Sequence, residues 1–255
     1  YWVIFLCALL ACGEIASVRD VSAQSSGIDT SPLHTSIDWS TVLGGDEFDS
    51  KPIVASAPDG YIYVAGVSYG TWGNPIRDFS APVELTQSDV FVAKLDPHGR
   101  LQWNTFLGGS DKDFGVGIAL DGSGTIYVSG WVASINAQGN RPPSGDAHGI
   151  DSFVAKLDSD GNLLWTTYLG SDGHDEYGRI VIDAAGFIYV TGSSGAPWSC
   201  SPAPCTSRPF IGGENPTDMD VYVAKLDPDG NLLWNSFLGG NANDVGEDIA
   251  ITPAG

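Results

Sequence analysis

Acidic residues in short glycine-containing turns are the strongest candidates for chemistry in this chain. Carboxylate oxygens are hard ligands that suit calcium, and the turns predict a calcium set at Asp111, Asp113, Asp172, Asp175 and Glu176. A second interpretation stays open, because a turn aspartate also accepts hydrogen bonds from backbone N–H groups of its own turn. Apart from calcium, no cofactor is predicted.

Four cysteines form two separate groups. Cys200 and Cys205 lie in the Pro- and Ser-rich stretch APWSCSPAPCTSRP. In an exported chain these two residues are expected to form a local disulfide, with two free thiols as the alternative. Cys12 ends the string LLAC, which resembles a bacterial lipobox and would place a lipid on Cys12.

The first residues predict an export signal over 1–23, followed by a linker over 24–36. Residues 2–12 form an apolar run that is too short to span a membrane, and the small residues VSA at 21–23 suit a signal peptidase. Cleavage after Ala23, a lipid on Cys12 and an uncleaved anchor stay open. All three place the protein outside the cytoplasm, secreted or at the cell surface, and confine membrane contact to the anchor or lipid. The sequence has no initiator Met, so we expect that its true start is missing.

No group of residues predicts a catalytic site. GVSYG at 66–70 matches G-x-S-x-G, but the residues that follow cannot open the helix that this motif requires. His174 stands among acids and is interpreted as a solvated loop histidine. Lysines that recur at one repeat position are expected to pair with acidic neighbours rather than to act in catalysis: Lys94, Lys156 and Lys225.

The net charge of the chain limits the classes of partner that it can bind. The chain has 255 residues and a formal net charge of -20, from 11 basic against 31 acidic residues. Nucleic acids and anionic membranes require basic surfaces, so they are excluded as partners. Hydrophobic residues make up 42% of the chain and eight are Trp, which is enough for a substantial core.

One stretch of sequence is written three times, beginning at Asp89, Asp151 and Asp220: DVFVAKLDPHGRLQWNTFLGG, DSFVAKLDSDGNLLWTTYLGS and DVYVAKLDPDGNLLWNSFLGG. A Gly follows each repeated Trp by five residues and an Asp follows it by ten, from Trp39 as well as Trp103, Trp165 and Trp234. A repeat of this kind indicates a stacked or radial architecture, in which each unit needs its neighbours to bury its apolar faces.

Each unit predicts four short strands, for example at 115–121, 125–130, 151–158 and 163–170, with Asp-Gly hairpin turns. In the third strand Val90 and Val92 face one way, whereas Phe91, Ala93 and Leu95 face the other. Both faces are apolar, as expected of a sheet stacked between two others. The fold class is therefore all-β, a β-propeller of four-stranded antiparallel blades.

The repeat begins and ends part-way through a four-strand unit, which predicts a partial ring over 37–255. Complete blades are expected at about 51–107, 115–170 and 178–239, with a lone outer strand at 37–44 and the start of a further blade at 246–255. The chain is thus expected to be a fragment of a larger ring. Its repeated tryptophans are expected to pack in the core rather than to bind sugars.

The repeated residues also resemble a known family. Units of the form W-x-T-x-L-G-G, I-A-x-D, I-Y-V-x-G and D-x-F-V-A-K-L-D-x-x-G are similar to the SBBP repeat, a seven-bladed β-propeller repeat. The resemblance covers roughly 37–255 and implies an exported cell-surface or S-layer-like protein. The first unit departs from the pattern, with Ala57 in place of Asp and Lys51-Pro52 in place of Gly.

Strand direction predicts which loops share an end of the blades. The turns that join one unit to the next (the inter-unit turns) and the long segments at 67–88, 131–150 and 193–219 should share one rim. Long connections of this kind are often functional. The leading hypothesis is a non-catalytic, exported cell-surface module for binding, adhesion or envelope structure, which acts through this acidic rim on an envelope protein or glycan. An extracellular propeller enzyme (a polysaccharide lyase, glycosidase or quinoprotein) and a spacer without a ligand are the alternatives.

Overall fold

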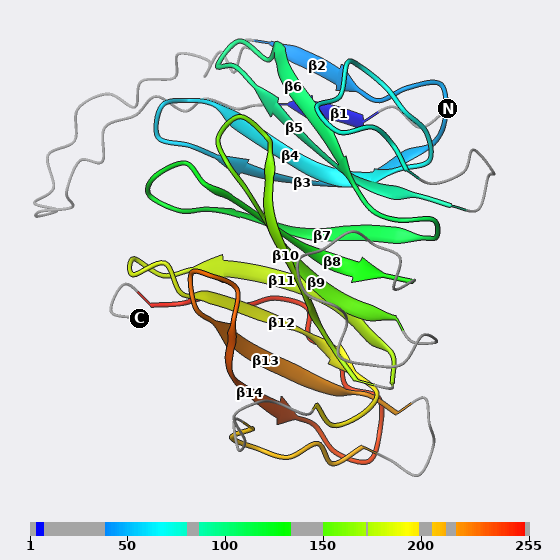
Figure 1. Cartoon of the computed structure of the whole chain (residues 1–255), viewed down its shortest axis with the longest axis vertical. Helices are drawn as coiled ribbons and strands as arrows, with labels where there is room; N and C mark the ends of the chain where they lie inside the picture. The colour runs from blue at the N-terminus through cyan, green and yellow to red at the C-terminus, as the bar shows by residue number, and fades with distance from the viewer. Residues whose placement is uncertain are drawn as a thin grey trace, which may run out of the picture.

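The structure, a computed structural model, describes residues 39–80, 87–133, 150–171, 173–198, 206–212 and 218–252, with the backbone alone for residues 4–7 and for positions 116 and 177. Every regular element in this part is a strand. None of the described residues forms a helix long and apolar enough to cross a membrane. Figure 1 shows the strands gathered into sheets that follow one another along the long axis of the molecule.

Three four-stranded antiparallel sheets follow the chain in simple order, and each one is a propeller blade. The predicted fold class is confirmed, although the three sheets do not close into a ring. The strands of the blades are β3 Asp49–Ser56, β4 Ile62–Ser68, β5 Asp89–Leu95 and β6 Leu101–Leu107; β7 Asp113–Leu120, β8 Ile126–Val132, β9 Asp151–Leu157 and β10 Leu163–Leu169; and β11 Asp175–Ile182, β12 Ile188–Ser194, β13 Asp220–Leu226 and β14 Leu232–Leu238.

Two short strands lie beyond the first blade. The outer strand expected at 37–44 is β2, Ser40–Leu43, and it pairs in antiparallel fashion with β1, Ile4–Cys7. β1 falls inside the segment predicted to be an export signal, so the structure places this backbone beside the fold. The export signal itself stays a prediction.

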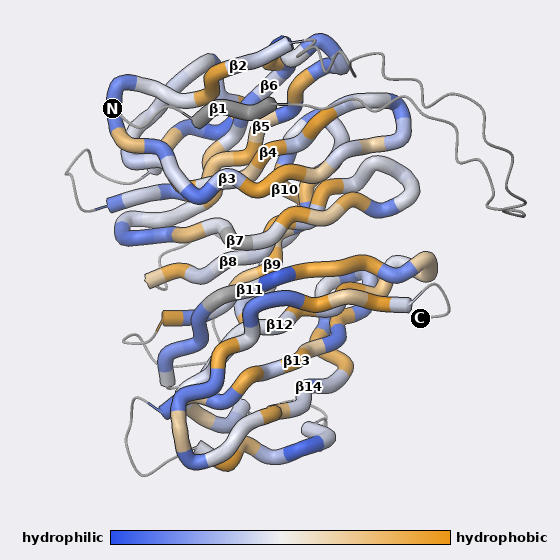
Figure 2. The backbone as a smooth tube through the Cα atoms, turned by 180° about the vertical axis from the view of Figure 1, so that it is seen from behind, coloured by the Kyte–Doolittle hydropathy of each residue, from blue (hydrophilic) through white to orange (hydrophobic). Residues whose placement is uncertain are grey.

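The hydrophobic cores lie between blades rather than within them. Val90 and Val92 of β5 join a core with residues of the second blade, such as Val128 and Phe153. The opposite face of β5 packs against β2 and the long segment of its own blade through Phe91, Ala93 and Leu95. This confirms the predicted alternation along the strand. In Figure 2 the hydrophobic stretches run mostly along the strands, and the turns are mostly hydrophilic.

The repeated tryptophans join each blade to the next one. Trp39, Trp103 and Trp165 are half-buried and lie against the hairpin glycines Gly99, Gly161 and Gly230 of the following blade. These glycines have positive φ angles and no side chain, so an indole ring can approach them closely. The predicted packing role is confirmed, although the rings lie at the edge of the seam and not in its centre.

The repeated lysines also cross the seams, but their partners differ from the expected ones. Lys94 Nζ donates to the Ser159 carbonyl at 3.2 Å, and Lys156 Nζ donates to the Pro228 carbonyl at 3.1 Å. The ammonium groups lie over aromatic rings, as Lys156 does over Tyr127. The predicted pairing with acidic side chains is therefore wrong for these two residues. Each lysine instead bonds a backbone carbonyl in a hairpin turn of the next blade.

Candidate binding face

The rim predicted from strand direction forms in all three blades. The backbone N–H of Asp113 donates to the Ser88 carbonyl at 2.8 Å, which ties the inter-unit turn to the end of the preceding blade's long segment. The same bond recurs from Asp175 to Ile150 and from Asp244 to Met219, at 2.7 Å each. Inter-unit turns and long segments therefore meet at one end of the blades.

A repeated aspartate closes each inter-unit turn. Its Oδ2 accepts the N–H of the residue four positions earlier, at distances between 2.7 and 3.1 Å: Gly45 to Asp49, Gly109 to Asp113, Ser171 to Asp175 and Gly240 to Asp244. This is the structural role that the sequence left open beside calcium. Asp113 and Asp175 are almost completely buried, so their carboxylates face the interior.

A second aspartate, at the start of the third strand of each blade, faces the first across a glycine. Asp89, Asp151 and Asp220 are all buried. A methyl group on Gly108 would collide with carboxylate oxygens of both Asp89 and Asp113. Gly170 and Gly239 stand between their aspartates in the same way. We call these the rim carboxylate pairs: Asp89 with Asp113, Asp151 with Asp175, and Asp220 with Asp244.

Burial raises the pKa of three of these carboxyl groups, those of Asp113, Asp151 and Asp175. It raises the pKa of Asp113 to about 8, and the nearby charges of Asp89 and Asp111 act in the same direction, against the Gly109 N–H that lowers the pKa. Burial also raises the pKa of Asp175 to about 7 and that of Asp151 to about 6. Desolvation disfavours the charged form of a buried carboxyl group, so these three groups hold a proton to a higher pH than an exposed aspartate.

The innermost strands β3, β7 and β11 lie beside one another and form a cleft at the centre of the fan. Each inner strand has a register shift shortly after its rim aspartate, which turns the chain out of the ladder. The cleft has a volume of about 270 Å³ and is lined by Lys51, Pro52, Ile53, Gly115, Gly178, Arg179, Gly246 and Glu247. We call it the axial cleft.

Sequence comparison identifies the repeat unit. The SBBP family, a beta-propeller repeat, matches residues 164–197. Residues 164–197 are an SBBP repeat. This unit runs from β10 through β11 and β12, so it crosses from one blade into the next and contains the rim aspartate Asp175.

Two curated relatives extend the likeness at low identity. The regulatory protein FlaEY of Caulobacter vibrioides is 28% identical over 221 residues, which are 84% of this chain and 22% of that protein. The WD repeat-containing protein L264 of Acanthamoeba polyphaga mimivirus, which is named as uncharacterized, is 23% identical over 255 residues, or 90% of this chain and 18% of that protein. The chain spans about a fifth of the length of these relatives.

The SBBP pattern did not reveal the structure of the long segments. Trp72 packs edge-on against Phe91 and Phe106, and Trp198 packs against Tyr222 and Phe237. Each segment then runs beside the outer strand, where Phe106 N–H donates to the Arg77 carbonyl and Phe237 N–H donates to the Arg208 carbonyl. A shared Trp, followed later by R-x-F at 77–79 and 208–210, is the sequence signal for this arrangement.

The third-strand aspartates also hold these long segments in place. Asp89 Oδ2 accepts the backbone N–H of Ser80, and Asp220 Oδ2 accepts that of Ile211, each at 2.7 Å. The repeated D of the string D-x-F-V-A-K-L-D therefore has two structural tasks, one in a rim carboxylate pair and one at the end of a long segment. Its role as a binding residue for the segment was not predicted.

The predicted calcium ligands do not converge among the described residues. Asp113 and Asp175 belong to different rim carboxylate pairs, and Asp172 lies outside the described residues, as do Cys12, Cys200 and Cys205. No group of three potential metal-ligating side chains comes together in the part of the chain that the structure describes. Calcium binding, the disulfide and the lipid stay predictions.

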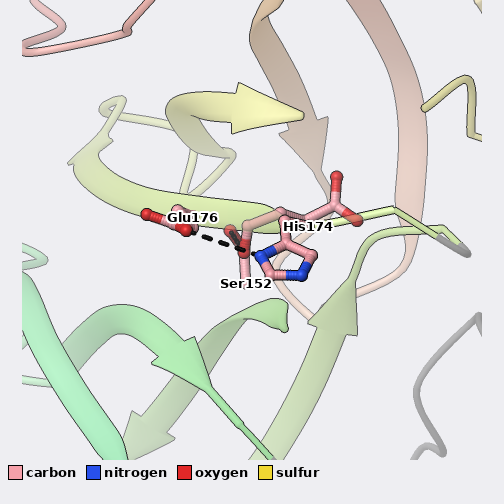
Figure 3. Close-up of polar contacts among 4 residues, drawn as sticks. Ser152, His174 and Glu176 are labelled. Carbon is pink, nitrogen blue, oxygen red and sulfur yellow. Dashed lines mark hydrogen bonds and ion pairs between the residues drawn. The ribbon is translucent and has the colours of Figure 1, made fainter. Parts of the chain in front are cut away.

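The hydroxyl and imidazole groups near the rim are accounted for by structural contacts. Figure 3 shows Ser152 near His174 and Glu176. Ser152 is buried and its hydroxyl donates to the Asp175 carbonyl at 3.2 Å while accepting from the Tyr222 hydroxyl at 2.9 Å. His174 is exposed and lies 3.8 Å from a Glu176 oxygen. Ser68 of the G-x-S-x-G match is buried and donates to the Gly70 carbonyl.

The axial cleft contains residues that the sequence did not single out. Polar side chains near the axis were not evident from the sequence, yet Lys51, Arg179 and Glu247 line the cleft. They occupy the positions two to four residues after the rim aspartate, which read KPI, GVG, YGR and GED in the successive units. Irregularity inside an otherwise regular strand was the signal that could have found them.

Proposed function

We propose that this chain is a non-catalytic binding module that acts outside the cytoplasm, at the cell surface, with a protein or glycan of the cell envelope as its partner. The observation that carries the proposal is the rim. It gathers the inter-unit turns and the ends of the long segments of three blades at one end of the fold. Loops held on a rigid scaffold are the usual place for binding residues.

The chemistry of the rim favours binding over catalysis. Its buried carboxylates bond turn N–H groups, as in Asp113 and Asp175, and its buried serines bond backbone carbonyls. The exposed surface of the inter-unit turns is acidic, as at Asp46 and Glu47. A surface of this charge suits a cationic partner or a neutral glycan and repels polyanions.

A binding screen with a matched pair of variants tests the proposal. The purified chain is applied to arrays of glycans and envelope components, together with Asp46→Asn/Glu47→Gln at the rim and Asp160→Asn/Asp229→Asn at the opposite hairpin turns. All four residues are exposed and each double variant removes two negative charges. The proposal expects a bound component whose signal falls in the rim variant only. A spacer would give no signal from any component, and equal loss in both variants would contradict a role for the rim.

Export is tested separately. Residues 1–36, preceded by the start of the chain that the gene encodes, are fused to a reporter that is active only outside the cytoplasm. A Cys12→Ser copy is labelled with a radioactive fatty acid beside the original. The proposal expects reporter activity from both fusions if cleavage follows Ala23. Label on the original alone would identify a lipoprotein, which the proposal also accommodates. An inactive reporter in both fusions would contradict export.

A further inference from the structure

The axial cleft holds positive charge in a strongly acidic protein. Only 11 of the 255 residues are Lys or Arg, and the formal net charge is -20. Two of these cations, Lys51 and Arg179, come from different blades and line the same cleft. Repeated seam lysines such as Lys94 bond the next blade, but Lys51 and Arg179 stand at positions where the other units have different residues.

Lys51 is held in an unusual backbone conformation. Its φ angle is 51°, the only positive value for a residue other than glycine among the described residues. Such a conformation is uncommon for a residue with a side chain, and it persists at sites where the surrounding structure enforces it. The ammonium lies 4.8 Å from the centroid of the Phe114 ring, and no described carboxylate forms an ion pair with it.

Arg179 is positioned from the other side of the cleft. Its Nε donates to the Glu247 carbonyl at 3.3 Å, which joins the inner strand β11 to the segment after β14. A guanidinium is planar and can bind a carboxylate through two parallel hydrogen bonds. Glu247 also belongs to the lining, so the cleft brings one acidic residue beside two basic residues.

The size of the cleft limits the ligand. A volume of about 270 Å³ is far more than the roughly 10–15 Å³ that a single water needs on the same measure. This volume lies just below the range of about 300–1,000 Å³ for drug-sized ligands. Glycine backbone forms much of the wall, at Gly115, Gly178 and Gly246. A β-carbon at each of these positions would meet neighbouring strands, such as Val90 beside Gly115, so close strand packing explains the glycines.

We propose that the axial cleft binds a small hydroxylated acid of the sugar-acid class. Lys51 and Arg179 bind its carboxylate, and Glu247 accepts a hydrogen bond from one of its hydroxyl groups. The inference deepens the proposed function and rests on it, because it names a ligand class for the centre of the same rim. The acidic surroundings favour a single carboxylate over a polyanion, whose other charges would face the acidic turns.

Calorimetric titration of the intact chain with galacturonate tests this assignment. Galactose has the same ring without the acid, and inorganic phosphate has the charge without the ring. We expect galacturonate to bind at millimolar concentration or below, with galactose and phosphate each at least about tenfold weaker, a difference of about 1.4 kcal/mol. Phosphate binding as tight as galacturonate would overturn the sugar-acid assignment, and no heat from galacturonate at about 10 mM would overturn the site.

Variants locate the binding. Lys51→Gln and Arg179→Gln should each weaken galacturonate at least about tenfold, whereas Arg100→Gln, at an exposed hairpin turn, should leave it unchanged. Thermal unfolding of each variant checks that it is folded, and Lys51→Gln carries the test if Arg179→Gln is not. Equal affinity in the Lys51 and Arg100 variants would overturn the proposal. A positive rim screen with no galacturonate binding would reject this inference and leave the proposed function standing.

Discussion

At the scale of single residues, the glycine that ends each fourth strand shows how a repeat position acquires its identity. Gly108, Gly170 and Gly239 are required by the carboxylates on either side and not by a positive φ angle. The repeat in the sequence makes this glycine easy to find. The need for glycine, however, arises from two aspartates that come from different blades. Only the folded structure brings them together.

Replacing Gly108 with Ala should destabilise the protein by about 1–3 kcal/mol, because a methyl group there overlaps the carboxylates of Asp89 and Asp113. Urea unfolding measures the change. Gly240→Ala is the matched control, since nothing lies within 4 Å of a methyl group at Gly240. Equal losses in the two variants would show that the close approach at Gly108 is not a constraint.

The pKa of Asp113 gives a prediction about pH. Its folded-state pKa of about 8 lies above the ordinary value of 3.8, so the folded protein binds this proton more tightly than the unfolded chain. The resulting stability is complete below about pH 4 and is lost as the pH rises towards 8. Urea unfolding at pH 5 and pH 8 should therefore show a lower free energy of unfolding at pH 8.

Asp113→Asn tests that the effect arises at this residue. The amide is neutral at every pH and its oxygen can still accept the Gly109 N–H that Asp113 Oδ2 accepts. We expect the free energy of unfolding to fall less in the variant than in the native chain between pH 5 and pH 8. At pH 8 the variant should be the more stable of the two. An unchanged pH dependence in the variant would contradict a protonated, buried Asp113.

At the scale of elements, the sequence predicted the strands and their faces well, because hydrophobic alternation and Asp-Gly turns are local signals. Val90 and Val92 indeed face the next blade. The partners of the lysines were not predicted, since a hairpin carbonyl such as that of Ser159 belongs to a distant part of the chain. The outer course of the long segments was missed because their shared Trp and R-x-F signals differ in spacing.

The seam between the second and third blades offers a test at this scale. Trp165→Ala should cost roughly 2–4 kcal/mol, somewhat less than a fully buried Trp, because the ring is half-buried against Gly230. The exposed neighbour Leu164 supplies the control, and Leu164→Ala should change the free energy of unfolding by less than about 1 kcal/mol. A similar cost for both variants would argue against docking of the indole on the next blade.

At the scale of the whole molecule, the residues that repeat in every unit and the residues that differ between units have different roles. The repeated residues build the seams, the hairpins and the rim carboxylate pairs, so they could be predicted as structure. The residues that differ between units, such as Lys51 and Arg179, meet at the axial cleft. Their meeting depends on the fan of blades, so irregularity along the strands could mark these positions but could not show that they share one cleft.

The central claim is that successive blades fan around one axis and are tied together at the rim. Amide hydrogen exchange measured by NMR tests it most directly, through the backbone N–H groups of Asp113, Asp175 and Asp244, each bonded to the preceding blade. The fan predicts that these three amides exchange at least about 100-fold more slowly than the exposed hairpin amides of His98 and Asp160. Exchange of all three at the rate of those hairpin amides would contradict it.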